Sequence, residues 1–300
     1  MKTDLIEKVK LFPRTCGVYK LYSKNQVMYV GKSKNLRSRV MSYFSKSHNR
    51  EKIFIMMKYI DHVDFISTNT HLEALVLEYE LIKKYRPMYN SMYKNDRNEY
   101  YYLNLSKDNI FKVNFKEGIG PFNSKKFLEN FLNSMKNIYP IKYKDGKFDL
   151  KFSVFPNKLS INDIEETFYS LNFIFSSEDN MVLFIDFLET KMKLEAKLLK
   201  FETASFYREL IKYFSYLKNL EFERKVFKSG NYVVSIENCF YLISRGEIVY
   251  FNKDTTFEEF RDFSIDFLKG FDSYKNISNE LKNIIYNECI TDNVKVYKLK

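Results

Sequence analysis

Two short apolar and aromatic segments, separated by only three polar residues, restrict the fold of this chain more than any other feature. They run from Cys16 to Tyr22 and from Gln26 to Gly31, with Ser23-Lys24-Asn25 between them. A polar turn of this length between two strand-like segments predicts a β-hairpin.

The register of this hairpin brings tyrosines and glycines together. With residues 23–25 as the loop, Tyr19 lies opposite Tyr29 and Gly17 lies opposite Gly31. Because side chains alternate along a strand, all four positions share one face, where the glycines leave room for a ligand beside two hydroxyl groups. The alternative is a hairpin whose rings simply pack, since the sequence holds 24 tyrosines.

Apolar residues at helical spacing follow the hairpin and predict a helix from Lys32 to Phe44. Ser33 or Asn35 can cap it. The free N–H groups at the start of this helix, next to Lys32, suit an anion. Arg39 and Tyr43 continue a polar ridge along the helix, so a phosphate could lie between Lys32 and Arg39.

Further segments complete a small α+β unit around the hairpin. Apolar segments at 53–60 and 63–67 predict a helix and a strand, and another helix is expected from about Leu72 to Tyr85, ending before Pro87. The expected fold class is therefore α+β, with an antiparallel sheet of about three strands flanked by helices within residues 1–95.

The remainder divides into three expected parts. Residues 96–180 read as a connecting α/β region with a Tyr-rich strand and a helix near 123–139. Residues 181–220 contain no Gly or Pro and predict one long helix or a helical hairpin. Residues 221–300 form a small α+β unit, with strands at 232–236, 240–244 and 247–251 and then two helices.

Charge and composition narrow the function classes. The net charge is +11, and residues 1–100 alone carry +9. Such a local excess favours a polyanion such as DNA, although a Lys-rich surface encoded by an AT-rich genome would look the same. No run of about 18 apolar residues and no leader is present, which predicts a soluble, cytoplasmic protein without a membrane partner. Three scattered cysteines and three histidines form no zinc pattern.

One carboxylate on the helix from Leu72 differs from the others in direction. At 100° per residue, Glu73 and Glu80 point almost the same way, whereas Glu78 lies between apolar positions. A carboxylate in apolar surroundings needs a cation or a hydrogen-bond donor. A metal ligand and a buried ion pair are both open on this reasoning.

These motifs, taken in order, resemble those of a known nuclease family. Gly17-Val18-Tyr19, then Tyr29-Val30-Gly31 and the stretch from Lys32 to Phe44 resemble a GIY-YIG nuclease domain. The segments from Glu73 to Glu78 and from Leu81 to Pro87, then Tyr89-Asn90, resemble the version found in UvrC, the excision-repair endonuclease subunit. The combined pattern covers about 80 residues in the right order.

The resemblance implies a catalytic set and a metal. Glu78 would hold one divalent cation, Mg²⁺ or Mn²⁺, and Tyr29 would be the general base with Tyr19 as its positioning partner, although the two could exchange roles. One of these phenols would need a pKa lowered by Lys32, Arg39 or the metal, or would act through metal-bound hydroxide. The other implied catalytic residues are Lys32, Arg39, Tyr43 and Asn90. Lys32 and Arg39, with Lys34 and Arg37, would also contact DNA, although a solvated basic face is the simpler reading of Lys34 and Arg37.

A second, less specific resemblance implies a protein partner. The stretch from Leu199 to Ile211 is similar to the UVR motif, a helical hairpin through which UvrC contacts the helicase subunit UvrB. Ser205 and Glu209 depart from its usual Ala and Asp. The implied partner-binding residues are Phe201, Glu202, Ala204 and Arg208. Periodic Leu and Phe residues in such a hairpin are otherwise ordinary core packing.

The expected function is a metal-dependent DNA endonuclease of nucleotide excision repair that makes one incision near a lesion in double-stranded DNA, on its 3′ side. About 80 residues after Leu220 leave no room for the second nuclease domain of UvrC, so the chain is nearer to shortened, Cho-like homologues. The alternatives are a free-standing structure-specific or mobile-element endonuclease and a non-catalytic adaptor that binds UvrB and DNA.

Overall fold

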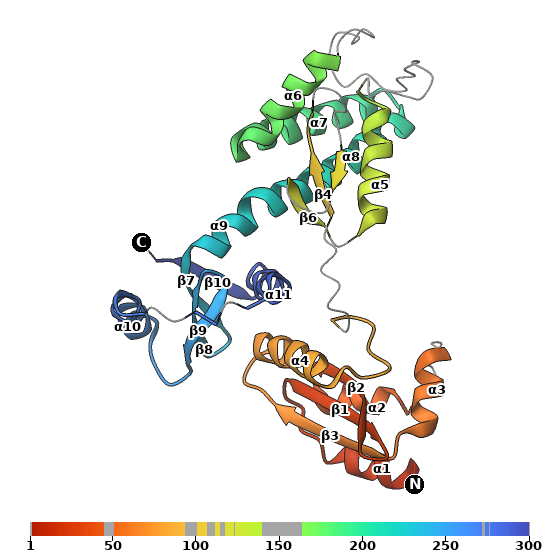
Figure 1. The fold of residues 1–300 in the computed structure, drawn as a ribbon, viewed down its shortest axis with the longest axis vertical. Coiled ribbons are helices and arrows are strands. Elements are labelled where there is room, and N and C mark those ends of the chain that lie inside the picture. Colours follow the sequence, from red (N-terminus) through yellow and green to blue (C-terminus); the bar gives the residue numbers. More distant parts are fainter. Residues whose placement is uncertain are drawn as a thin grey trace. The chain divides into compact units, whose positions relative to one another are not determined.

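The structure, a computed structural model, describes residues 2–44, 51–93, 101–106, 112–114, 118–122, 124–139, 164–271, 274–275 and 277–299. The chain forms two compact units (Figure 1). One combines Met1–Arg97 with Phe227–Lys300, and the other is Asn98–Val226. The expected boundary between residues 1–95 and 96–180 lies outside the described residues.

The first unit is built on a three-stranded antiparallel sheet with the order β2-β1-β3 (Figure 1). Its strands are β1 (Gly17–Ser23), β2 (Gln26–Ser33) and β3 (His62–Ser67). Helix α4 (His71–Tyr85) packs on one face through Ala74 and Ile82, against Val18 and Val30. The opposite face carries the core formed with α1 (Lys2–Lys10), α2 (Leu36–Ser42) and α3 (Glu51–Tyr59). The expected α+β class and three-stranded sheet are confirmed.

The hairpin turn is one residue shorter than the sequence predicts. Only Lys24 and Asn25 form the loop, both with positive φ (48° and 66°), which is the turn that matches the twist of paired strands. An irregularity between Leu21 and Tyr22 shifts the register further. Tyr19 therefore lies opposite Gly31 instead of Tyr29. The expected pairing was wrong by two positions, a shift that keeps both tyrosines on the same face.

The helix after the hairpin is also shorter than expected. Strand β2 continues to Ser33, so Lys32 belongs to the strand, and α2 begins only at Leu36. Asn35 is its cap: Asn35 Oδ1 accepts a hydrogen bond from the Ser38 amide at 3.0 Å. The expected helix start beside Lys32 was therefore wrong, because Lys32 stands before the helix.

Residues 227–300 form a second sheet with the order β10-β7-β8-β9 (Figure 1). Its strands are β7 (Asn231–Ile236), β8 (Cys239–Ser244), β9 (Glu247–Asn252) and β10 (Val294–Lys298). Around them lie α9 (Arg224–Ser229), α10 (Phe257–Lys269) and α11 (Asn279–Cys289). The expected strands and helices are found here, and β10 is an addition. This sheet and α11 share an apolar cluster with α4, so the segment is not a unit of its own.

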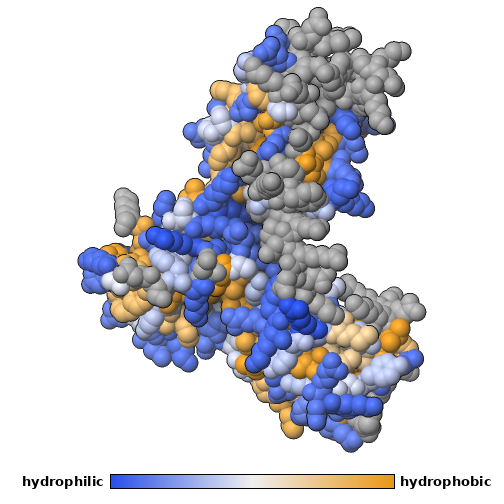
Figure 2. Space-filling model, viewed as in Figure 1, coloured by the Kyte–Doolittle hydropathy of each residue, from blue (hydrophilic) through white to orange (hydrophobic). Residues whose placement is uncertain are grey.

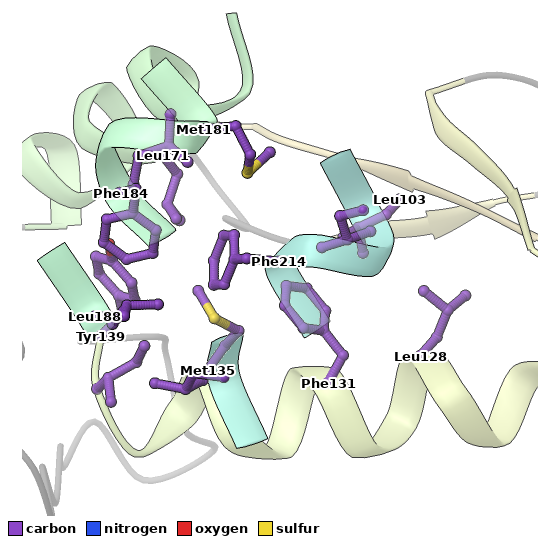
Figure 3. Packing of buried hydrophobic residues seen from close by; sticks show 14 of the residues in the cluster. Leu103, Leu128, Phe131, Met135, Tyr139, Leu171, Met181, Phe184, Leu188 and Phe214 are labelled. Carbon is purple, nitrogen blue, oxygen red and sulfur yellow. The ribbon is translucent and has the colours of Figure 1, made fainter. Parts of the chain in front are cut away.

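The second unit packs a small sheet and helices around aromatic residues. The sheet has the order β5-β4-β6, from β4 (Tyr101–Asn104), β5 (Lys112–Asn114) and β6 (Ile119–Phe122). The helices are α5 (Lys125–Lys136), α6 (Ile164–Ser176), α7 (Glu178–Lys197) and α8 (Phe201–Lys218), followed by the π-helical turn η1 (Asn219–Glu223). Phe214 lies in the middle of the core, with Phe184 on one side and Phe131 on the other (Figure 3).

The segment expected as one long helix or a hairpin is a hairpin. Helices α7 and α8 pack along each other and are joined at Leu198 to Lys200, where Leu199 has a positive φ of 59°. The hairpin supplies much of the core of the second unit, including Leu188 and Leu210.

No helix in the described part of the chain is long and apolar enough to cross a membrane. The face of the molecule seen in Figure 2 is mostly hydrophilic, with separate hydrophobic patches.

Candidate active site

Three tyrosines from separate elements meet on the face of the sheet opposite α4. Tyr19 comes from β1, Tyr29 from β2 and Tyr43 from the end of α2, and their ring centroids lie 5.9 to 6.5 Å apart. The hydroxyl oxygens of Tyr19 and Tyr43 are 2.6 Å apart and share a buried hydrogen bond. The hairpin pattern predicted the first two as neighbours, and Tyr43, which the family resemblance implied as a catalytic residue, lies in the same group.

Gly31 makes this arrangement of rings possible. The Tyr19 ring lies over Gly31, so a Cβ at position 31 would stand 2.4 Å from the Tyr19 hydroxyl and 2.8 Å from the Tyr29 ring. Gly17 is equally constrained, because a Cβ there would meet the carbonyl oxygen of Ile66 at 2.3 Å. Both glycines are thus required by close packing rather than by room for a ligand's backbone.

Arg39 lies at the edge of the tyrosine group. Its guanidinium carbon stands 5.2 Å from the centre of the Tyr43 ring, a cation–π contact. Burial alone would lower the pKa of Arg39, but the neighbouring Tyr19, Tyr43 and Tyr29 phenols outweigh it and raise that pKa. Arg39 is therefore a permanent positive charge next to three phenols.

The pKa values of the phenols run against expectation. Burial raises the pKa of Tyr29 to about 12, with Tyr43 and Glu78 adding to the effect and Arg39 opposing it. Burial also raises the pKa of Tyr19 well above its ordinary value, reinforced by Tyr43 and Tyr29. Lowering of a phenol pKa by Lys32 or Arg39 alone is not found, because desolvation exceeds the attraction of Arg39.

Glu78 projects from α4 toward the edge of the sheet. It occupies the same row of the helix as Ala74 and Ile82, which pack on the sheet, and its Oε1 accepts a hydrogen bond of 2.9 Å from the Lys32 amide. Burial raises the pKa of the Glu78 carboxyl, while Lys32 and Arg39 partly offset the effect. The carboxylate is thus half-buried and within electrostatic reach of Arg39.

The surroundings of Glu78 suit a single divalent cation. Within the described ranges the second oxygen of the Glu78 carboxylate makes no hydrogen bond or ion pair. The same ranges contain no cluster of three or more His, Cys, Asp or Glu side chains that could bind a metal, so Glu78 would have to bind an ion without a second acidic side chain in such a cluster. Mg²⁺ is commonly bound by one or two carboxylates with several waters. One half-buried carboxylate with a free oxygen fits that pattern.

Asn90 completes the outer edge of β2. Its Oδ1 accepts from the Val30 amide at 2.9 Å and its Nδ2 donates to the Val30 carbonyl at 2.8 Å. The preceding Tyr89 amide donates to the carbonyl of Met28 at 3.0 Å. Asn90 thus binds the strand immediately before Gly31.

The remaining basic candidates differ in their surroundings. Arg37 donates from Nε to the carbonyl of Phe12 at 2.6 Å, so it joins α2 to the segment that follows α1. Lys34 is exposed, and the Lys32 side chain is half-buried. Of the predicted DNA-contacting residues, Arg37 is thus the one whose side chain links two segments of the fold through a hydrogen bond to a backbone carbonyl.

Tyr93 was not predicted and lies close to Glu78. Its ring packs edge-on against Tyr79, with centroids 5.2 Å apart, and its backbone has a positive φ of 61°. Burial raises the pKa of Tyr93 to about 12, and the Glu78 charge adds to the effect. The recurrence of tyrosine at positions 85, 89 and 93 was the available signal.

The predicted partner-binding residues lie at the start of α8. Phe201 is 66% exposed and Leu199, just before the helix, is 73% exposed, which is unusual for large apolar side chains. Glu202 and Arg208 are exposed as well. Ala204 is buried within the hairpin, so its neighbours form the accessible surface.

The sheet, the tyrosine group and the lone glutamate place residues 15–91 in the GIY-YIG class of nuclease domains. Within that class the domain is UvrC-like, because these residues match the family described as the UvrC-like GIY-YIG domain.

Individual relatives agree with this assignment. UvrABC system protein C from Borrelia duttonii is 50% identical over 95 residues, covering 31% of this chain and 16% of the relative. The protein of the same name from a Thermotoga strain is 34% identical over 230 residues, covering 70% of this chain. The match spans only 40% of that relative's length.

Among solved structures, the chain is similar to the GIY-YIG N-terminal endonuclease domain of UvrC from Thermotoga maritima, which was bound to its catalytic magnesium. The identity is 39%, and the match covers 30% of this chain and 99% of that one, with a TM-score of 0.28.

Proposed function

We propose that this protein is a divalent-cation-dependent DNA endonuclease of cytoplasmic nucleotide excision repair, which hydrolyses one phosphodiester on the 3′ side of a lesion in double-stranded DNA. The observation that carries the proposal is the convergence of Glu78, Arg39 and three tyrosines at one edge of the sheet. A carboxylate can hold a cation, a guanidinium can offset charge on the phosphate and a phenol can act as a base, so this set of groups suits cation-assisted phosphodiester hydrolysis.

The residues of the site have complementary roles in the proposed reaction. Arg39 and Lys32 offset the negative charge that builds up on the phosphate in the transition state. Tyr29 would accept a proton from the attacking water only as a phenolate, a form that its raised pKa disfavours until a cation binds at Glu78. Tyr19 holds the ring group in position through its bond to Tyr43. Asn90 keeps β2 in register at Val30, next to the reacting groups.

Glu78 is the proposed ligand for the cation, Mg²⁺ or Mn²⁺. When bound, such an ion supplies Lewis-acid stabilisation of charge on the phosphate and on the leaving oxygen. The raised pKa of the Glu78 carboxyl indicates that the free carboxylate is poorly solvated. A bound cation relieves that cost, which favours occupation of the site.

The proposed partner is a UvrB-like helicase subunit that binds the hairpin of α7 and α8. The support is the exposed apolar end of the hairpin, formed by Leu198, Leu199 and Phe201. Apolar side chains exposed together on a folded surface are typical of protein-binding sites.

The decisive experiment is a nicking assay on a duplex with one defined adduct, with and without a UvrB-like subunit, in Mg²⁺, Mn²⁺ or chelator. We expect one incision that requires both the ion and the partner. Arg39→Ala and Glu78→Ala should lower the nicking rate by at least a factor of about 100 while leaving DNA binding intact.

Matched controls separate the site from the surface. Glu80→Ala changes an exposed carboxylate two residues from Glu78 on the same helix, and Arg261→Ala removes an exposed arginine of α10. Both should nick at the wild-type rate. Retained cleavage by purified Glu78→Ala protein contradicts the cation assignment, and two incisions flanking one lesion contradict a single nuclease site.

The free-standing endonuclease differs from this proposal in needing no partner. Deleting residues 181–220 cannot discriminate the two, because Met181, Leu188 and Leu210 belong to the core of the second unit. Nicking that is equally fast with and without the UvrB-like subunit favours the free-standing enzyme. Partner and DNA binding without any nicking favours the non-catalytic adaptor.

A further inference from the structure

Helix α4 carries Glu78 and is covered on two sides. The row formed by Ala74, Glu78 and Ile82 faces the nuclease sheet. Leu72, Leu75 and Tyr79 form a second apolar row, and this row packs against residues of β7, β8 and α11. The segment 227–299 therefore contacts the helix that presents Glu78, on a face about 90° around the helix from the sheet-facing row.

A buried polar contact fixes the N-terminal end of α4 to this segment. The Tyr241 hydroxyl on β8 lies 2.7 Å from Thr70 Oγ1 and donates to Glu73 Oε1 at 2.9 Å. Thr70 is the cap of α4, where its side chain accepts the Glu73 amide, and it is fully buried. Tyr241 thus forms part of the capping arrangement of α4. His71 adds a contact of 2.9 Å to Glu288 of α11.

A second polar contact lies next to Glu78 itself. The Tyr79 hydroxyl is 2.7 Å from Ser278 Oγ, and Ser278 also caps α11 by accepting the Leu281 amide. One turn later, Lys83 Nζ lies 3.6 Å from Glu280 Oε2. The two anchoring positions, Thr70 with Glu73 and Tyr79 with Lys83, stand on either side of Glu78 along the helix.

We propose that residues 227–299 are a positioning element of the nuclease site, which fixes the rotation of α4 about its axis and so aims the Glu78 carboxylate at the edge of β2. Successive residues on a helix differ by about 100° in direction, so holding Tyr79 also sets the direction of Glu78. Reacting groups lose activity when displaced by less than about 1 Å. This inference rests on the proposed function for its catalytic consequence, but not for the structural link.

The test uses the full chain with hydroxyl deletions at the two anchors, Tyr241→Phe and Tyr79→Phe, and their combination. Tyr250→Phe is the matched control, because Tyr250 lies on the neighbouring strand β9 and packs on Phe260, Phe263 and Phe267 of α10, away from α4. The primary readout is hydrogen exchange of the α4 amides in the metal-free protein, which is independent of cation, DNA and activity.

We expect each anchor variant to exchange the amides of residues 72–85 about fivefold faster than wild type, with a larger effect in the double variant and none in Tyr250→Phe. In the nicking assay, kcat should fall with KM for DNA unchanged, because the variants move Glu78 without touching the DNA surface. If an anchor tyrosine variant does not fold, Glu280→Gln loosens the half-exposed contact to Lys83 and is read in the same way.

Three outcomes would contradict either this inference or the proposed function, and they can be told apart. If the exchange of α4 in the double variant equals that of Tyr250→Phe, the segment does not hold the helix. If α4 exchanges faster but kcat is unchanged, the segment stabilises α4 without positioning the site, and the proposal fails. If wild-type protein does not nick DNA at all, the proposed function fails, and the exchange experiment alone decides whether the segment holds α4.

Discussion

Gly31 is the position where the tyrosine group tolerates least change. A methyl group there would lie within 2.4 to 2.8 Å of the Tyr19 and Tyr29 rings. We expect Gly31→Ala to lower the free energy of unfolding by about 1 to 3 kcal/mol, because the rings must move. Gly270→Ala is the control, since a Cβ there meets nothing within 4 Å. Urea unfolding of the two variants measures the difference, and equal midpoints would contradict the packing argument.

The charged Glu78 carboxylate would serve the proposed cation site, but it lowers the stability of the folded protein when no cation is bound. Its pKa is raised in the folded protein, mainly by burial, so its favourable contribution is present below its unfolded pKa and is lost as pH rises through the folded value. We therefore expect Glu78→Gln in chelator to be more stable than wild type at pH 7.5, with a free energy of unfolding higher by about 1 kcal/mol. At pH 4 the advantage should vanish. Calorimetry at both pH values checks it, and an advantage that is the same at both contradicts the sign.

The residues of the site show which of its features could be predicted from the sequence and which could not. Tyr19 and Tyr29 were placed on one face correctly although their pairing was wrong, because a shift of two positions leaves the alternation intact. The raised pKa values of the phenols depend on burial under α2 and Tyr43. Such desolvation comes from tertiary packing, which local sequence patterns do not contain.

Strand β2 is an edge strand, and Asn90 substitutes for a missing neighbour there. Its amide makes the two hydrogen bonds to Val30 that a further strand would make. We expect Asn90→Ala to lower the free energy of unfolding by about 2 kcal/mol, because both Val30 backbone groups lose their partner. Hydrogen exchange at Val30 should accelerate, whereas the exposed neighbour variant Ser91→Ala should leave it unchanged. An unchanged Val30 amide in Asn90→Ala contradicts the role of Asn90 at this edge.

At the level of helices and strands, local signals predicted which elements exist better than where they end. Asn35 and Pro87 mark the boundaries of α2 and α4 by capping and backbone restriction, and both effects can be recognised in sequence. The extension of β2 through Lys32 cannot be recognised in this way. It depends on pairing with β1 and on the Glu78 carboxylate that binds the Lys32 amide from another element.

The division of the chain into units follows contacts that no local pattern reports. Residues 227–300 contain their own strands and helices, yet they share a core with α4, whose second apolar row (Leu72, Leu75 and Tyr79) would otherwise face water. That row is visible in the sequence as helical periodicity. Its partner is not visible, because it lies more than a hundred residues later in the chain.

The two units also separate two proposed activities, nicking in one and partner recruitment in the other. Phe201, at the exposed end of the hairpin, is 66% exposed, and Phe173 on α6 of the same unit is 62% exposed. Replacing either by Ser removes a similar apolar surface without opening a core. We expect Phe201→Ser to weaken binding of a UvrB-like subunit at least about tenfold, because a central aromatic contact commonly contributes 2 kcal/mol or more.

Phe173→Ser should bind that subunit as wild type does, and both variants should retain the same DNA affinity, since the basic residues of the nuclease domain are unchanged. Surface plasmon resonance with the immobilised subunit measures the first property and anisotropy of a labelled duplex the second. If both variants bind the subunit equally well, the end of the hairpin is not the contact surface. If Phe173→Ser alone loses binding, the contact surface includes α6 instead. Because the two side chains are similarly exposed, a difference between the variants reports where the subunit binds and not how much apolar surface was removed.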